Sequence, residues 1–159
     1  ETLESRYPIR VETYGLREDS CGPGEHRGGL GLVRQYRLLA DDAVLQLRAD
    51  RAKIPPYGLR GGGPAAPSRN ILDPDGRAEE VPSKITRNVR KGDVIRHEQA
   101  GGGGYGDPLI RDPDLVAVDV ADEKISRKFA EENFGVVIQP GEAQPDLAAT
   151  EVCRARLRS

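Results

Sequence analysis

Methionine and tryptophan are absent from this chain, and phenylalanine, histidine and cysteine occur only twice each. Because aromatic residues make up 4% of the chain, we expect a thin core built from valine, leucine, isoleucine and alanine. A translated chain starts with methionine, so we expect that Glu1 is not the native first residue. Either an N-terminal portion was removed or the sequence is a piece of a longer chain. A chain of 159 residues is still long enough to bury a core.

Other absences exclude whole classes of function. There is no apolar run near the about 18 residues that a membrane-spanning helix needs, and no signal-peptide pattern. The net charge is −2, acids and bases alternate, and no basic stripe carries aromatics, so nucleic-acid binding is not expected. Cys21 and Cys153 have no neighbouring Cys or His, which argues against zinc and favours a reducing, cytoplasmic setting.

The first two-thirds of the chain predict antiparallel β structure. Alternating apolar and polar residues predict strands near 7–17, 30–39 and 43–50. A hairpin is expected around Asp73-Pro74-Asp75-Gly76, because proline presets a turn and glycine accepts a positive φ. Further strands are expected at 84–90 and around Ile95, on either side of a turn at 91–93. This spacing is typical of an antiparallel sandwich or barrel.

The last third changes to short helices, which makes the expected fold mainly β with a helical C-terminal segment, α+β as a whole. Asp112 and Ser126 are good N-caps for helices in 112–121 and 127–134, and Gly135 suits a helix end. Val136–Ile138 is expected to be a strand. We therefore predict a β-rich domain at 1–110, helices and a closing strand at 111–138, and a flexible tail at 139–159.

Three glycine-rich segments hold the polar residues with a functional interpretation. In the first, His26 is either a base or metal ligand, or a hydrogen-bonded loop residue. Arg27 suits a carboxylate or phosphate, or clamps an aspartate on the neighbouring strand. The second segment, at 50–70, is expected to be a lid or an interface loop. The third reads GGGGYGDP and lacks both the Walker and the Rossmann pattern, which favours a tightly packed corner over a phosphate loop.

Taken in order, these segments resemble a known family. They read YPIRVETYGLREDSCGPGEHRGGLGLVRQYRLL, PPYGLRGGGPAAPSRN, PSKITRNVRKGDVIRHEQAGGGGYGDPLIRDPDLVAVDV and FAEENFGVVI, and cover about Tyr7 to Ile138. Together they resemble the C-terminal part of the hydantoinase B/oxoprolinase family, the B-type subunit of N-methylhydantoinases and ATP-dependent 5-oxoprolinases. There are two departures. Cys21-Gly22 stands where the family usually has Gly-Gly, and Gly62-Gly63-Pro64-Ala65 lacks the usual basic residue.

The resemblance implies a hydrolase that opens cyclic amides in an ATP-coupled reaction. It implies an A-type partner that binds ATP with magnesium, and a metal ion, if present, in the N-terminal part of the B-type chain, with none bound here. This fragment alone is expected to be inactive. Alternatives are a subunit of an acetone- or acetophenone-type carboxylase and a non-catalytic assembly module. Candidate binding or interface residues are His26, Arg27, Gly28, Gly29, Arg60, Gly103, Gly104, Tyr105 and Asp107, with the last two expected to pin the turn.

Overall fold

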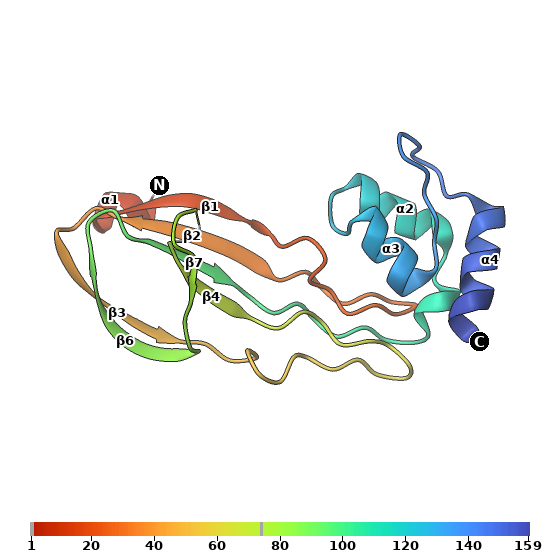
Figure 1. Cartoon of the computed structure of the whole chain (residues 1–159), viewed down its shortest axis with the longest axis horizontal. Coiled ribbons are helices and arrows are strands. Elements are labelled where there is room, and N and C mark those ends of the chain that lie inside the picture. Colours follow the sequence, from red (N-terminus) through yellow and green to blue (C-terminus); the bar gives the residue numbers. More distant parts are fainter. Residues whose placement is uncertain (1, 74) are drawn as a thin grey trace.

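The computed structural model describes residues 2–73 and 75–159 and has a β-rich end and a helical end (Figure 1). The β-rich end contains α1 (Thr2–Arg6), β1 (Ile9–Leu16), β2 (Leu32–Leu38), β3 (Asp42–Arg48), β4 (Arg69–Leu72), β5 (Glu79–Glu80), β6 (Lys84–Arg90) and β7 (Val94–Glu98). The helical end contains the 3-10 turn η1 (Pro108–Ile110) and helices α2 (Pro113–Ala121), α3 (Arg127–Phe134) and α4 (Leu147–Arg158). Long extended segments run side by side between the two ends.

The strands form two antiparallel units. The larger is a sheet with the strand order β1-β2-β7-β4-β5, and the smaller is a ribbon of β3 and β6. Neither closes into a barrel within the described residues, while the expected α+β class with antiparallel sheets is confirmed. The turn around Gly92, whose φ is 95°, joins strands of different units, because β6 pairs with β3 and β7 pairs with β2 and β4. The hairpin expected near Asp73 joins β4 and β5, and its Pro74 lies outside the described residues.

The helix boundaries follow the capping residues that the sequence predicts. The Asp112 carboxylate accepts from the Asp114 N–H at 3.0 Å where α2 begins, and the Ser126 hydroxyl accepts from the Phe129 N–H at 3.0 Å where α3 begins. Helix α3 ends at Gly135, which has a φ of 62° in the left-handed region. These short helices therefore start and stop where local side-chain and backbone chemistry dictates.

Two expectations for the C-terminal part are wrong. Residues 136–138 form no strand, because Val136 and Ile138 are buried against the helices instead of pairing with a neighbouring strand. The expected flexible tail contains helix α4, whose N-cap Asp146 accepts from the Ala149 N–H at 3.0 Å. Helix α4 is held to the preceding helix by Arg154, whose Nε donates to the Phe134 carbonyl at 3.1 Å. The expected domain division at residue 110 stays a prediction.

The principal core lies in the helical end and includes one residue from the first glycine-rich segment. Its buried members are Cys21, Val116, Ala117, Ile125, Ala130, Phe134, Val136 and Ile138. Cys21 thus ties the extended segments to the helices, and burial raises the pKa of its thiol to about 11. Cys21 and Cys153 are both free and buried. In the part of the chain that is described, no helix has the length and apolar character needed to cross a bilayer.

Replacing Phe134 with alanine tests this core. Phe134 is 0% exposed, so Phe134→Ala should lower the free energy of unfolding by about 3–5 kcal/mol through lost burial and a cavity. Val118→Ala is the control, because Val118 is 52% exposed on α2 and should change stability by roughly 0.5 kcal/mol or less. Urea denaturation followed by circular dichroism measures both, and equal effects would contradict the assignment of the core.

Candidate functional site

The three glycine-rich segments come together as one unit, which we call the glycine layer and define as residues 20–31, 57–64 and 101–107. The third segment lies between the other two. The Gly22 N–H donates to the Gly102 carbonyl at 2.8 Å, and the Gly104 N–H donates to the Gly63 carbonyl at 3.0 Å. The outer segments also meet directly, through the Gly63 N–H and the Pro23 carbonyl at 2.7 Å. Backbone pairing of this kind joins parts of the chain that are far apart in sequence.

Glycine is required in this layer because backbones touch where side chains would otherwise stand. A Cβ atom on Gly28 would lie 1.8 Å from the Gly102 carbonyl oxygen, and one on Gly103 would lie 1.9 Å from the Tyr57 carbonyl oxygen. None of these three glycines has a φ in the left-handed region. Close approach, rather than unusual backbone conformation, therefore explains these three glycines, as the packed-corner interpretation expects, whereas Gly61 and Gly106 of the layer have φ of 92° and 77°.

Four backbone N–H groups within residues 101–107 are committed to the protein itself, and they alternate with the N–H groups of Gly101 and Gly103. Those of Gly102 and Tyr105 donate to carbonyls of the first segment, and those of Gly104 and Gly106 donate to carbonyls of the second. A phosphate-binding nest needs successive N–H groups that point at one ligand. An ATP phosphate therefore does not fit this run. Within residues 2–73 and 75–159, no group of three or more His, Cys, Asp or Glu side chains is placed to hold a metal ion.

One edge of the layer exposes a row of three side chains, which we call the exposed row: His26, Leu59 and Tyr105. The His26 and Tyr105 backbones exchange hydrogen bonds of 2.9 and 3.0 Å, and Leu59 pairs with Tyr105 on its other side. The ring centroids of His26 and Tyr105 are 6.2 Å apart, and Tyr105 is 44% exposed. Arg60 follows Leu59 with a φ of 48° and is also exposed. The structure therefore brings His26 and Tyr105 to one accessible edge, and Arg60 is an exposed neighbour of Leu59 in the chain.

The remaining candidates have structural contacts. The Asp107 carboxylate accepts from the Leu109 N–H at 2.8 Å and caps η1, so it holds the turn that follows the glycine run. Gly29 has open space where a Cβ would stand, unlike its neighbour Gly28. Gly104 is closed in by the Pro23 carbonyl, 1.9 Å from where its Cβ would be. Gly28 and Gly104 are thus buried in the layer, and the exposed Asp107 holds the turn at its end.

Arg27 clamps an aspartate, although that aspartate lies on a helix. Its Nε donates to Asp119 Oδ2 at 2.7 Å and its NH2 donates to Oδ1 at 2.8 Å, which makes a two-pronged fork. Arg111 adds a third bond to Asp119 Oδ2 at 2.9 Å and stacks over Phe134. Burial alone would raise the pKa of Asp119, but hydrogen bonds and charges from Arg27 and Arg111 outweigh it and leave that pKa below its ordinary value of 3.8. This cluster joins the layer to α2.

Sequence reasoning missed Asp119, although the sequence holds a signal for it. Asp119 interrupts the apolar stretch LVAVDVA in α2, where it is 4% exposed. A carboxylate inside an apolar helix face indicates a buried partner of opposite charge, because an unpaired buried charge is costly. The pattern does not say which of the 24 basic residues provides that charge.

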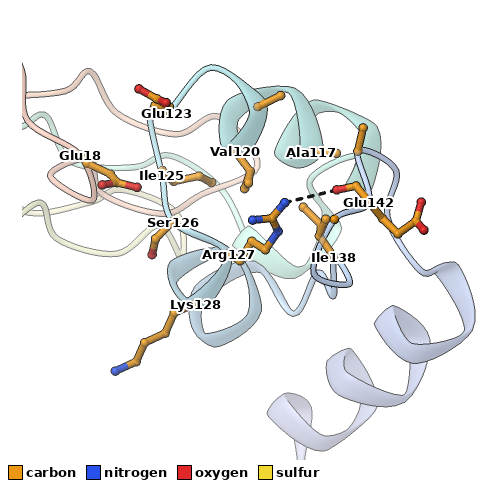
Figure 2. Close-up of a pocket in the computed structure, with 13 residues that line it drawn as sticks. Glu18, Ala117, Val120, Glu123, Ile125, Ser126, Arg127, Lys128, Ile138 and Glu142 are labelled. Atoms are coloured by element: carbon orange, nitrogen blue, oxygen red, sulfur yellow. Dashed lines mark hydrogen bonds between the residues drawn. The ribbon is translucent and has the colours of Figure 1, made fainter.

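A groove of about 710 Å³ lies apart from the layer's exposed row, at the helical end (Figure 2). Ala117, Val120, Ile125 and Ile138 give it apolar lining. Its charged lining residues are Glu18, Glu123, Arg127, Lys128 and Glu142, and Arg127 donates to the Glu142 carbonyl. None of the nine residues that the sequence predicts for a site lines this groove.

Comparisons with known proteins agree on one family. The family model described as hydantoinase B/oxoprolinase matches residues 1–108. An uncharacterised protein of Methanocaldococcus jannaschii is 43% identical over 138 residues, which are 87% of this chain and 24% of that protein. The putative B-type subunit of a D-/L-hydantoinase of Pseudomonas sp. is 37% identical over 145 residues, 89% of this chain and 24% of the relative. The chain thus spans about a quarter of the length of these relatives.

Two solved structures are similar over nearly the whole chain. The ATP-dependent caprolactamase of Pseudomonas jessenii has a TM-score of 0.84 and 29% identity, over 97% of this chain and 27% of that one. Nucleotide-free acetone carboxylase has a TM-score of 0.79 and 25% identity, over 95% of this chain and 25% of that one.

A pair of adjacent glycines tests the packing of the layer. Gly28→Ala should lower the free energy of unfolding by about 3 kcal/mol, because its new methyl group meets backbone that cannot move aside. Gly29→Ala should change it by roughly 1 kcal/mol or less, since nothing lies within 4 Å of its Cβ position. Thermal unfolding of the two variants measures the difference, and equal losses would show that the layer is not closely packed.

Asp119→Asn tests the link between the layer and α2. The change leaves Arg27 and Arg111 without a carboxylate and should cost about 3 kcal/mol of stability at neutral pH. Because the pKa of Asp119 is lowered, its contribution is complete above pH 3.8 and is lost as the pH falls below that value. Denaturant titrations at several pH values give the difference between the variant and the unmodified chain.

The control for Asp119→Asn is Glu80→Gln, which breaks an exposed pair with Arg69. The two side chains of that pair are 44% and 58% exposed, so the loss should stay below about 1 kcal/mol. A loss for Asp119→Asn as small as that of Glu80→Gln would contradict the buried clamp.

Proposed function

The chain belongs to the hydantoinase B/oxoprolinase family, and we propose that it forms part of the B-type subunit of an enzyme that opens a cyclic amide in an ATP-coupled reaction. The observation that carries this proposal is the match of 97% of the chain, at a TM-score of 0.84, to an ATP-dependent caprolactamase. The match to the relative named as a hydantoinase component supports the same chemistry. Because the chain spans about a quarter of these proteins, the activity belongs to the whole assembly.

In this proposal an A-type partner holds ATP with magnesium, and ATP supplies the activation of an amide oxygen that water alone does not displace. The present chain takes a positioning role next to the remainder of the B-type chain. Its backbone N–H groups at Gly102, Gly104 and Gly106 are already bonded, which supports a nucleotide site elsewhere. The layer gives His26 and Tyr105 a rigid edge to present to the active site or the partner. A cytoplasmic setting is part of the proposal, supported by the buried free thiols Cys21 and Cys153.

A second candidate is a subunit of an ATP-dependent ketone carboxylase. It is favoured by the similarity of 95% of the chain to acetone carboxylase, at a TM-score of 0.79. The present chain would keep the same positioning role, since both solved structures match nearly the whole of it. The two candidates differ in what receives the activated intermediate: water in the hydrolase, a carbon nucleophile in the carboxylase.

An assay of the full-length B-type chain with its A-type partner decides between these candidates. ATP hydrolysis is followed with 5-oxoproline, hydantoin, N-methylhydantoin and caprolactam, and with acetone or acetophenone plus bicarbonate. The proposal expects ATP turnover that is coupled to ring opening of at least one cyclic amide. Turnover that requires both ketone and bicarbonate would move the chain to the carboxylases and overturn the main proposal.

A third candidate, a non-catalytic assembly module, is favoured by the exposed hydrophobic groups Leu59 and Tyr105.

Tyr105→Ala in the complete complex separates this candidate from the main proposal. If the exposed row borders the active site, as the main proposal expects, the change should lower the turnover rate about tenfold or more while assembly stays intact. Tyr7→Ala is the control, because Tyr7 is 58% exposed at the β-rich end. Size-exclusion chromatography with steady-state kinetics separates the effects. Weaker assembly with unchanged turnover per complex would favour the assembly module.

A further inference from the structure

A row of four side chains crosses the large sheet on one face and holds a guanidinium without a partner among the described residues. The register pairs Tyr14 with Arg34, Arg34 with His97, and His97 with Asn70, so these residues of β1, β2, β7 and β4 point to the same side. Burial increases along the row, from Tyr14, which is 67% exposed, through half-buried Arg34 and His97 to Asn70, which is 1% exposed. The row is therefore most exposed at its β1 end.

Arg34 is the member of the row whose hydrogen-bonding capacity is unused. Its Nε is shielded from solvent and has no hydrogen-bond partner in the part of the chain that the structure describes. It also forms no ion pair within the described residues, whereas Arg37, Arg69 and Arg96 of the same sheet each pair with a glutamate. Native structures rarely leave a buried donor unpaired, so this guanidinium calls for an acceptor from outside the chain.

The acid that adjoins His97 in the sequence cannot supply that acceptor. Glu98 follows His97 along β7, so its side chain points to the opposite face of the sheet. There its carboxylate bonds Arg96 at 2.9 Å and pairs with Arg17 at 3.4 Å. The face that carries Arg34 therefore keeps an uncompensated positive charge next to the imidazole.

His97 is held in a form that suits an anion next to Arg34. Its Nδ1 lies 2.6 Å from Asn70 Oδ1, and since an amide oxygen only accepts, Nδ1 carries the proton. Nε2 is left to accept when the ring is neutral and to donate when it is charged. Burial lowers the pKa of His97, the charge of Arg34 lowers it further, and the charge of Glu98 across the sheet raises it in part, so that the pKa stays below its ordinary value. A bound anion would offset the charge and favour protonation of the ring.

We propose that Arg34 and His97 form a binding site for a carboxylate, bound edge-on by the Arg34 guanidinium with the imidazole beside it. Arg27 binds Asp119 through Nε and NH2 at 2.7 and 2.8 Å, and the same contact at Arg34 requires its side chain to turn its shielded Nε toward the ligand. While the imidazole of His97 is neutral, Arg34 alone matches the single charge of a carboxylate. The site is independent of the proposed function. The carboxylate comes from a small organic acid or from an Asp or Glu side chain of a protein segment.

Proton NMR of the imidazole groups tests this site, because the chain has only two histidines and His26 serves as an internal control. The chain is titrated with sodium acetate, and with sodium chloride at the same ionic strength. Acetate should raise the pKa of His97 by roughly 1 and leave that of His26 unchanged, since an adjacent opposite charge favours the protonated ring. Equal responses to acetate and chloride would overturn the proposal.

Three variants assign the effect to the fork of Arg34. Arg34→Gln should abolish the acetate response of His97, and Arg34→Lys, which keeps the charge without the planar fork, should weaken acetate binding about tenfold. Arg10→Gln changes an exposed arginine that pairs with Arg37 in the register on the opposite face, and it should leave the response intact. An acetate response that persists in folded Arg34→Gln, as judged by its His26 signal and circular dichroism, would overturn the proposal.

Peptides identify the source of the carboxylate. A blocked Gly-Glu-Gly peptide that binds at least tenfold more tightly than acetate, while its Gln counterpart does not bind, would indicate an acidic side chain of a protein segment. Acetate that binds as tightly as the Glu peptide would indicate a small organic acid. Failure of both acetate and the Glu peptide to shift His97 would refute the site.

Discussion

The direct contact of backbone with backbone in the glycine layer is the constraint on which the rest of the structure depends. The layer places three distant parts of the chain within hydrogen-bonding range, and its first segment then contributes Cys21 to the helical core and Arg27 to the clamp on Asp119. The sheet and the helices therefore hold together through the layer. A side chain on Gly28 or Gly103 would separate its segments, so the composition of the loops is fixed by packing.

This arrangement explains how a chain poor in aromatic residues forms a stable unit. The helical core is small, and the large sheet carries ion pairs such as Arg96 with Glu98 rather than a thick apolar face. Stability comes in part from the backbone hydrogen bonds between the segments of the layer. The buried charge cluster at Asp119 adds to it, where other cores rely on large apolar side chains. Among the described residues of the sheet, the Nε of Arg34 has no hydrogen-bond partner, which is why we propose a site there.

Local signals predicted much of this structure. The strands at 9–16 and 32–38, the caps at Asp112 and Ser126 and the stop at Gly135 follow from alternation and capping chemistry that neighbouring residues contain. The features that the sequence did not predict depend on contacts between segments that are distant in the sequence. Residues 136–138 look like a strand but fill the core, and helix α4 depends on packing against α3.

For the site, the glycine pattern predicted a packed corner, and the row of His26, Leu59 and Tyr105 forms only once the segments are assembled.

Amide hydrogen exchange across the three segments tests the central claim most directly. If the layer is one cooperative unit, the N–H groups of Gly22, Gly63, Gly102 and Gly104 exchange slowly and with a common opening free energy. Fast exchange at these positions, or a separate opening free energy for each segment, would contradict the account.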